Sequence, residues 1–464
     1  MTTERSFGEV HFGSAPLGNK ARTRRLASLA TQLVQHPGGT LPQKLCDPAA
    51  LRAAYRLMNR DEVTHRAVLA PHQAETLRRI AAHDGPVLIL CDSTELDYTT
   101  ITSLQRLGQI GNGEHRRGYI CQNCLAVDPQ TRLVIGLVNQ LLHNRADVPD
   151  GETKEQSRQR ASRESRLWPD GTCGLPGDAQ LIVVCDRGGD TFEELEHEDQ
   201  SGRRLVIRSQ HNRRIWVGHT GSSRVQYLES TLHRQKAAGS FTLHVAATAG
   251  HPARKAKLLV SYAAVRLLPP KQPRGDHGDQ PLPVWVVRVW EPEPPRNQQR
   301  LEWLLLTNEP IHSYEDARRV IGWYECRWVI EEYHKAMKTG CQIEDLQFTD
   351  ESRLEPMIAL LSVVALTLLN LRDASRRADA KTTPARRLLG AEYIEALSLW
   401  RHHEVREDWS VHDFFLALAR LGGHQNRKGD KPPGWLVLWR GWSALQLLVV
   451  GAQGERRRKK LGIT

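Results

Sequence analysis

The chain has 464 residues, with 64 Lys and Arg against 53 Asp and Glu, a formal charge of +11 and a pI near 9.4. This length exceeds what one core usually supports, so we expect two or three domains and exclude a small binding module. The excess of positive charge favours a polyanionic partner, with nucleic acid as the first expectation.

No segment is expected to lie in a membrane. The first 25 residues carry charged side chains and no apolar block, so we expect neither a signal peptide nor an anchor. The longest apolar stretch, Met357–Leu371, contains polar residues and is shorter than the roughly 20 residues of a membrane span, which favours a buried core helix. The eight Cys are scattered and form no disulfide framework, which indicates a reducing cytoplasm.

Residues 1 to about 75 have the pattern of short helices, with periodic stretches at Arg22–Val34 and Pro48–Met58. Basic side chains, including Arg22 and Arg25, crowd the start of the first long helix. Free backbone amides and basic side chains suit DNA phosphates there, although a solvated basic face has the same pattern. We therefore expect an N-terminal helical DNA-binding domain.

From Val87 the pattern changes to that of an α/β domain. Two continuous apolar runs, Val87–Cys91 and Leu181–Cys185, are typical of strands buried on both faces, and each ends on an aspartate. Between these two runs we expect two antiparallel strands and then a charged helix. After the second run we expect a further helix and a further strand. The ranges expected for these five elements are Tyr119–Val127, Leu133–Gln140, 154–168, 191–196 and Leu205–Arg208.

This order of elements is that of a ribonuclease-H-like fold. Residues from about 212 to 300 alternate strand-like pieces with Pro-rich segments, which predicts an inserted, mostly β subdomain, and Trp303–Leu306 returns to the core. The sequence thus predicts an α/β protein with three domains. They are an N-terminal helical domain (1–75), a ribonuclease-H-like mixed-sheet catalytic domain (76–372) and a C-terminal helical domain (373–464).

The aspartates that follow the two buried runs, Asp92 and Asp186, are candidate metal ligands. Taken singly, each could be a turn former or a helix cap. If the two strands are parallel, however, both carboxylates lie at the carboxyl edge of the sheet, where ligands of open α/β sheets bind. Two carboxylates at such a short distance repel each other unless a cation lies between them.

Residues 324–338 supply a third carboxylate if they form one helix. An arc of roughly 80° on that helix would carry the polar residues Tyr324, Arg327, Glu331, Lys335 and Lys338. The opposite side would carry the packing residues Cys326, Val329, Ile330, Tyr333 and Met337. Glu332 falls outside the polar arc, so Glu331 is the preferred ligand, and His334, at the edge, is expected to be a bystander or to contact substrate. A solvated face with Glu–Lys pairs is the alternative.

The polar arc combines a carboxylate for a hard cation with tyrosine, arginine and lysine side chains that can hold phosphate oxygens. Mg²⁺ is the expected ion, and two such ions about 4 Å apart can activate the attacking oxygen and stabilise the leaving oxygen. Hydrolysis and strand transfer of DNA can both use such a site. By contrast, Cys121 and Cys124 form a lone C-x-x-C pair that points to opposite faces of a strand, so zinc is not expected.

The helix resembles the YREK signature of the insertion-sequence-four family of bacterial DDE transposases, here as Tyr324, Arg327, Glu331 and Lys338. The resemblance extends to Cys91–Thr94, Cys185–Arg187 and Trp303–Thr307, and it includes Arg254–Lys255 in the insertion and Ala419–Gly423 near the C-terminus. A departure occurs at Gly188–Gly189, where the best-known member of the family has an acidic residue. That departure leaves the acidic triad intact.

The resemblance implies that the protein cuts its element out through a DNA hairpin and joins it to target DNA, as a homodimer bound to two element ends. It implies that the C-terminal domain dimerises and that the enzyme works on the DNA of a bacterial cytoplasm. It assigns the metal ions, Mg²⁺ with Mn²⁺ as a substitute, to Asp92, Asp186 and Glu331.

The resemblance also assigns DNA contacts. Hairpin phosphates would be held by Tyr324, Arg327 and Lys338, with Lys335 on the same face. Trp303 would hold a flipped base by stacking, although an aromatic residue at the start of an apolar strand is usually core. The further DNA contacts expected are Arg187, Arg208, Arg254, Lys255, Arg22 and Arg25.

Two alternatives stay open at the level of sequence. One is a catalytically silent DNA-binding derivative, such as a transposase relic or an inhibitor. The other is a nuclease on the same fold that has the metal site but lacks the joining step.

Overall fold

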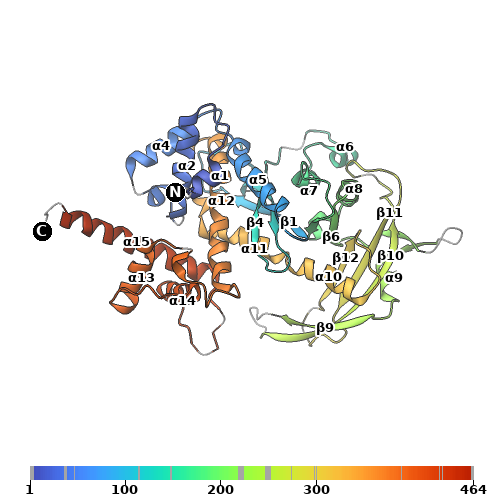
Figure 1. The fold of residues 1–464 in the computed structure, drawn as a ribbon. Coiled ribbons are helices and arrows are strands. Elements are labelled where there is room, and N and C mark those ends of the chain that lie inside the picture. Colours follow the sequence, from blue (N-terminus) through green and yellow to red (C-terminus); the bar gives the residue numbers. More distant parts are fainter. Residues whose placement is uncertain are drawn as a thin grey trace.

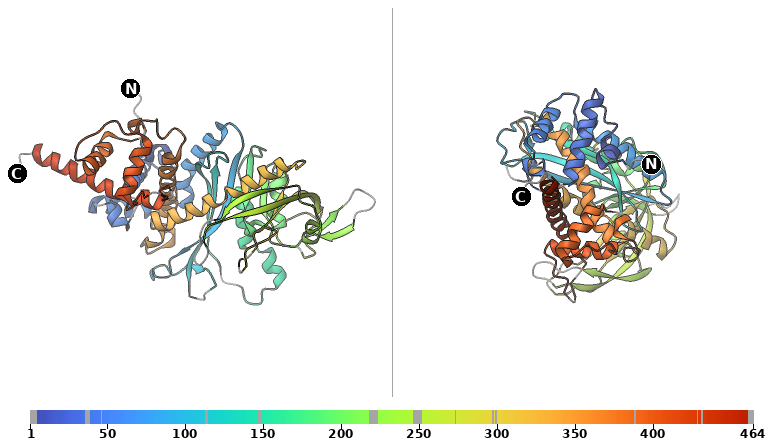
Figure 2. Two further views of the ribbon diagram at one scale, coloured as in Figure 1. Left: turned by 90° about the horizontal axis from the view of Figure 1, so that it is seen from below. Right: turned by 60° about the vertical axis from the view of Figure 1, so that its left-hand side comes forward.

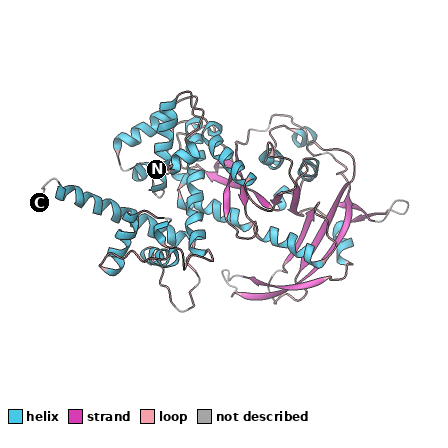
Figure 3. Cartoon of the chain, in the orientation of Figure 1, coloured by secondary structure: helices cyan, strands magenta, loops and turns pink. Residues whose placement is uncertain are grey.

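The computed structural model describes residues 5–35, 39–45, 47–112, 115–146, 149–217, 224–245, 252–272, 274–296, 298, 300–387, 389–427, 429–430 and 432–460. A large mixed sheet is flanked by helices from both ends of the chain (Figure 1). Helices predominate on the side of the two termini and strands on the other (Figure 3). The predicted fold class is thereby confirmed.

The N-terminal region is helical because each of its longer helices has a packing face and most have a polar cap. Ser6, Asp47 and Thr64 accept hydrogen bonds from free backbone amides at three helix starts. The apolar side chains of these helices join the same core as one face of the sheet. The helices are α1 (Phe7–Phe12), α2 (Lys20–Gln35), α3 (Leu41–Leu45), α4 (Pro48–Met58) and α5 (His65–Ala81).

The catalytic half of the sheet combines a meander with parallel strands. Strand β1 pairs antiparallel with β3 and parallel with β5, β5 pairs parallel with β6, and β6 pairs antiparallel with β12. The parallel pairing assumed for the two apolar runs is therefore present. The strands are β1 (Val87–Asp97), β2 (Gly108–Gln109), β3 (Arg117–Val127), β4 (Val134–His143), β5 (Leu181–Cys185), β6 (Arg204–Arg208) and β12 (Glu302–Thr307).

Strand β1 is longer than expected. Its parallel pairing with β5 runs from Val87 opposite Leu181 to Cys91 opposite Cys185. Its antiparallel pairing with β3, however, continues to Asp97. Asp92 therefore lies inside a strand and not at its end, because the apolar run marks only the part of β1 that is covered on both sides.

The helix expected at 154–168 is wrong as a single element. The structure has α6 (Lys154–Gln159), a 3₁₀ turn and then α7 (Leu167–Thr172), with an extended backbone at Arg160. No residue of α6 is buried, so packing does not extend it, whereas Leu167 and Trp168 are buried and anchor α7. Helix α8 (Phe192–Gln200), capped by Thr191, follows β5 as predicted.

The insertion lengthens the same sheet. Its strand β11 pairs with β12 from Trp285 opposite Thr307 to Trp290 opposite Glu302, and the other strands continue outward in the order β11-β10-β7-β8, with β9 beside β10. The predicted β character of this segment is present. Its elements are β7 (Arg214–Val217), β8 (Arg224–Tyr227), α9 (Leu228–His233), β9 (Gly239–Val245), β10 (Arg254–Leu267) and β11 (Leu282–Trp290).

Helix α12 (Glu351–Arg376) is the central helix of the molecule and contains the predicted buried stretch. It packs against α2, α5 and β4 on one side and against C-terminal helices on the other. Within the described residues, α12 and Trp435–Arg456 are long and apolar enough to cross a membrane, but 78% of the apolar window of α12 is buried inside the protein. Its apolarity is therefore that of a core helix.

The C-terminal helices α13 (Ala391–His402), α14 (Val411–Leu421) and α15 (Trp435–Lys460) form a separate small core around Leu397, Phe414 and Leu438. The end of α15 projects beyond the rest of the molecule (Figure 2).

Candidate active site

Asp92 and Asp186 directly follow the last parallel residue pair of β1 and β5, Asp92 within β1 and Asp186 just after the end of β5. The residues before them, Cys91 and Cys185, face each other across the last parallel pair of β1 and β5. Burial and the nearby charge of Asp186, with a smaller contribution from Glu331, raise the pKa of Asp92 to about 7, although the charge of Arg327 opposes the shift. Asp186 accepts a hydrogen bond from the backbone N–H of Gly188 at 2.7 Å. The structure thus brings the two predicted aspartates together.

The segment with the YREK signature is not one regular α-helix, which corrects the geometry assumed from the sequence. Helix α10 (Tyr314–Glu325) ends before Arg327, helix α11 (Trp328–Lys335) follows, and Ala336–Gly340 forms a π-helical turn. The N–H of Arg327 bonds to the carbonyl of Tyr324 three residues back, whereas that of Cys341 bonds to Ala336 five residues back. One turn is therefore tightened and a later turn widened.

The packing face of this segment is nevertheless as expected, whereas Tyr324, which was expected on the polar face, is only 7% exposed. All five predicted packing residues are buried: Cys326, Val329, Ile330, Tyr333 and Met337. His334, which was expected to be a bystander or a substrate contact, is 8% exposed, and its Nε2 lies 3.2 Å from the amide nitrogen of Asn123. Burial lowers its pKa to about 3, so His334 is a neutral core residue rather than a substrate contact.

Arg327 joins the helix to the aspartates. Its Nη1 lies 3.2 Å from Oδ2 of Asp92, and its Nη2 forms an ion pair with Glu331. Glu332 instead forms an ion pair with Arg372 of α12. The preference for Glu331 over Glu332 at the site therefore agrees with where the two side chains lie.

These three carboxylates fit a hard divalent cation by their chemistry. Asp92 is partly buried and lies near the like charge of Asp186, and the Arg327 guanidinium donates to its Oδ2 at 3.2 Å. Oxygen ligands of this kind are those that Mg²⁺ and Mn²⁺ prefer. In the described part of the chain, no three His, Cys, Asp or Glu side chains stand close enough to hold an ion as they are.

Aromatic and basic side chains border the carboxylates. The ring of Tyr324, which is 7% exposed, lies 5.9 Å from the ring of Trp303, which is only partly buried. Burial raises the pKa of Tyr324, while the charges of Arg327 and Arg208 lower it. Arg208 is also held through its Nη2 by the carbonyl oxygen of Glu302 at 3.1 Å. Tyr324, Trp303 and Arg208 thus belong to one cluster with Arg327.

The predicted lysines have different surroundings. Nζ of Lys338 lies 3.2 Å from Oε1 of Glu344, which also accepts the backbone N–H of Asp97 at 2.9 Å. Lys338 is thereby tied to the end of β1, whereas Lys335 is exposed, as is Arg187 in the turn after Asp186. Glu344 was missed by the sequence reasoning, because only the fold brings it to Lys338.

Four predicted DNA contacts lie away from this cluster. Arg254 pairs with Glu291 and donates from Nε to Gln298 at 2.8 Å, so its guanidinium is engaged within the insertion. Lys255 beside it is exposed. Arg22 pairs with Glu62 at 2.7 Å, and Arg25 on the same helix is exposed. Figure 1 shows α2 and β10 on opposite sides of the molecule.

Buried polar side chains form hydrogen-bond networks on both faces of β1 and β3 next to the candidate active site. On the side of α11, Gln140 donates to Asn123 at 2.8 Å and to Ser362 at 2.9 Å. Sequence reasoning missed this network, although Gln122 and Asn123 inside an otherwise apolar run were a signal for it. Cys121 and Cys124 lie in different core clusters, as expected for opposite faces of a strand.

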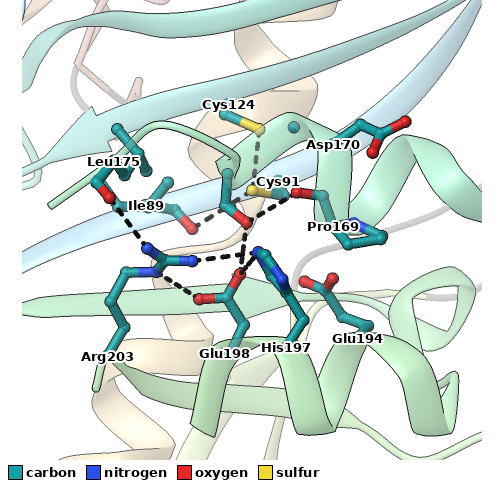
Figure 4. A network of polar contacts seen from close by, with 12 residues as sticks. Ile89, Cys91, Cys124, Pro169, Asp170, Leu175, Glu194, His197, Glu198 and Arg203 are labelled. Atoms are coloured by element: carbon teal, nitrogen blue, oxygen red, sulfur yellow. Dashed lines mark hydrogen bonds and ion pairs between the residues drawn. The ribbon is translucent and has the colours of Figure 1, made fainter. Parts of the chain in front are cut away.

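The other side of the sheet carries a second network (Figure 4). Glu198, which is fully buried, accepts a hydrogen bond from Nε of Arg203 at 2.6 Å and another from Thr172. Sγ of Cys91 lies 3.0 Å from Sγ of Cys124. These contacts anchor the strand position immediately before Asp92.

Comparison with protein-family models identifies the chain. Residues 4–63 match the model described as Transposase DNA-binding, and residues 83–368 match that described as Transposase DDE domain. The second match spans more than half of the chain and includes every residue of the cluster around Asp92. The chain therefore belongs to the DDE transposases, which are DNA-cleaving and strand-transferring enzymes that generally use divalent metal ions. DNA is its partner.

Proposed function

We propose that the protein is a cut-and-paste transposase of the insertion-sequence-four type. It binds the inverted-repeat ends of its element, cleaves DNA by metal-assisted phosphodiester hydrolysis and hairpin formation, and joins the 3′ ends to target DNA. The proposal rests on one arrangement within the part of the chain that matches the DDE domain. Asp92 and Asp186 follow a pair of neighbouring parallel strands, and Arg327 forms ion pairs with both Asp92 and Glu331.

Asp92, Asp186 and Glu331 are the proposed metal ligands. Two Mg²⁺ ions, with Mn²⁺ as a substitute, would activate the attacking oxygen and stabilise the leaving oxygen of the cleaved phosphodiester. The protein's own contribution would be to hold Asp92 of β1 and Asp186 after β5 on the sheet, and to present Glu331 to them from α11. The buried contacts of Cys91 and Asn123 on the two faces of that sheet support this role.

Arg327, Tyr324 and Lys338 are the proposed contacts to hairpin phosphates, with Lys335, Arg208 and Arg187 at the margin. Arg327 is positioned by two carboxylates and carries a planar set of donors that suits phosphate oxygens. The partly buried Trp303 beside Tyr324 supports a stacking role toward an extrahelical base. Outside the cluster, the proposed DNA contacts rest on Lys255 and Arg25, because carboxylates already hold Arg254 and Arg22.

The C-terminal domain, residues 373–464, is proposed to hold two copies together on paired element ends in the bacterial cytoplasm. Exposed apolar side chains on α15 support this, among them Leu447 at 68% and Val450 at 52% exposure. Residues 1–75 and 76–372 are the proposed DNA-binding and catalytic domains.

A nicking assay tests the metal-dependent cleavage. The substrate is the DNA that borders the coding region, with its inverted repeats, and the reaction is run with Mg²⁺, with Mn²⁺ and with a chelator. We expect nicking by the wild type with either ion, no nicking with the chelator, and loss of nicking in Glu331→Gln. Glu315→Gln, an exposed carboxylate at the start of α10, is the matched control and is expected to nick normally. An inactive wild type would point instead to a silent DNA-binding derivative.

A joining assay separates a transposase from a nuclease on the same fold. The wild type receives a pre-cut element end with a free 3′ hydroxyl, together with plasmid DNA as target. Joined product is expected, because cleavage and joining use one site with different nucleophiles. Nicking without any joined product would favour the nuclease.

A further inference from the structure

A cavity of about 550 Å³ lies beside the candidate active site. It is lined by residues from 157–165, the start of α8, the start of β7 and the segment after β10. Helices α6 and α8 lie in the upper right of Figure 1. Its volume is typical of a small-ligand site. None of the residues proposed above for metal or DNA binding lines it.

The charges in this cavity do not cancel. Its two acidic residues are already engaged: Asp190, fully buried, pairs with Arg213 at 2.7 Å, and Glu193 pairs with Arg163 at 2.5 Å. Further guanidinium groups line the same space. They belong to Arg158, Arg214 and Arg274.

Among the described residues, these three guanidinium groups have no carboxylate partner. Arg214 donates from Nη2 only to the carbonyl oxygen of Pro269, at 3.0 Å. Arg158 and Arg274 have no side-chain partner within the described ranges. Several uncompensated positive charges around one cavity attract an anion.

The remaining walls suit a flat apolar group next to that anion. Phe192, Leu268, Pro269 and Pro270 line the cavity, and the N-terminus of α8, with its partial positive charge, borders it at Thr191 and Phe192. A nucleotide of a DNA strand combines the two properties, because its phosphate carries the negative charge and its base has a face that stacks on such side chains.

The cavity lies at the same edge of the sheet as the aspartates. Asp186 begins the turn that leads into α8, and Arg208 ends β6 immediately before the segment that lines the cavity. Oδ2 of Asp190 accepts the backbone N–H groups of Gln210 at 2.6 Å and His211 at 3.0 Å. The floor of the cavity is thus fixed to the strands that position the active site.

We infer that this cavity is a second DNA site, which binds one nucleotide of a strand leaving the active site, with its phosphate on Arg158, Arg214 and Arg274. The inference rests on the proposed function, since it takes DNA as the substrate. The strand comes either from the target or from the element's own end, and the two sources can be separated.

The test measures the salt dependence of DNA binding without added divalent ion. Wild type and the double variant Arg158→Ala/Arg274→Ala are titrated with a short single-stranded oligonucleotide, a duplex of arbitrary sequence and a duplex that carries the bordering inverted repeat. Loss of the contact to this one phosphate is expected to make the slope of log K against log salt shallower by about 0.7 on the single strand. Arg377→Ala/Arg406→Ala, exposed and in the C-terminal domain, removes the same charge and is the control.

A shallower slope on arbitrary duplex places a target strand in the cavity, whereas a change confined to the inverted-repeat duplex places the element's own strand there. Equal slopes for the cavity variant and the control on all three DNAs overturn the inference. Unfolding curves show whether both variants fold, and removal of two unpaired guanidinium groups is expected to leave them unchanged. A wild type that binds with the expected slopes but neither nicks nor joins would overturn the proposed function and not the cavity.

Discussion

Lys44 donates a hydrogen bond from its Nζ to the backbone carbonyl oxygen of Cys341, 2.8 Å away. Lys44 lies in α3 of the N-terminal region, and Cys341 follows the π-helical turn that carries Lys338. Lys44 is 1% exposed, and burial lowers its pKa to about 8. A buried cation thus joins the matched DNA-binding region to the end of the signature helix.

Lys44→Met is expected to lower the free energy of unfolding by about 1–3 kcal/mol, because it leaves buried carbonyl groups without their donor while keeping the length of the side chain. Chemical denaturation of the purified variant measures this. Lys381→Met, at an exposed position, is the control and is expected to leave stability within about 0.5 kcal/mol of wild type. Equal stability of both variants would mean that the contact contributes nothing.

Acidification is expected to weaken the packing of α1 on α5. Nδ1 of His72 lies 3.0 Å from Nδ1 of His11, and Nε2 of His72 accepts the backbone N–H of Leu137 at 3.0 Å. Both rings are therefore neutral in the folded protein. Burial lowers the pKa of His11 to about 4 and that of His72 well below its ordinary value.

The unfolded chain binds more protons than the folded one between about pH 4 and pH 6.5, so stability falls as the pH decreases through this window. The expected loss from His11 is on the order of 2 kcal/mol between pH 7.5 and pH 5. Thermal unfolding across this range measures it. His11→Gln is expected to flatten the dependence, because one of the two titrating rings is gone, and an unchanged profile in that variant would exclude His11 as a source.

The buried ion pair of Glu198 and Arg203 is expected to stabilise the part of the sheet next to the active site (Figure 4). Glu198→Ala leaves a buried guanidinium without its carboxylate, which is expected to cost about 3–5 kcal/mol of stability. Glu404→Ala removes the partner of the exposed Arg406 and is expected to cost less than about 1 kcal/mol. Denaturant unfolding of the two variants compares them, and similar losses would show that the buried pair is no stronger than a surface pair.

Local sequence patterns predicted the parts of the fold that depend on burial. The runs before Asp92 and Asp186 are apolar because β5 and the first part of β1 are covered on both faces, and that alone placed β5 and the parallel part of β1 correctly. The break at Arg327 and the π-helical turn could not be predicted, since they depend on contacts with strands and helices distant in the chain. Likewise, nothing near Arg254 showed that Glu291, which directly follows β11, would hold its guanidinium.

The side-chain shape at position 327 is expected to matter as much as its charge. Arg327 reaches Asp92 and Glu331 at once with two nitrogens of one planar group, which a lysine cannot do. Loss of one charge-assisted hydrogen bond corresponds to about 1.5–3 kcal/mol, so Arg327→Lys is expected to nick about 10 to 100 times more slowly than wild type. Arg319→Lys, on the exposed side of α10, is the control and is expected to keep wild-type rates. If Arg327→Lys nicked at the control's rate, positive charge alone would suffice between the carboxylates.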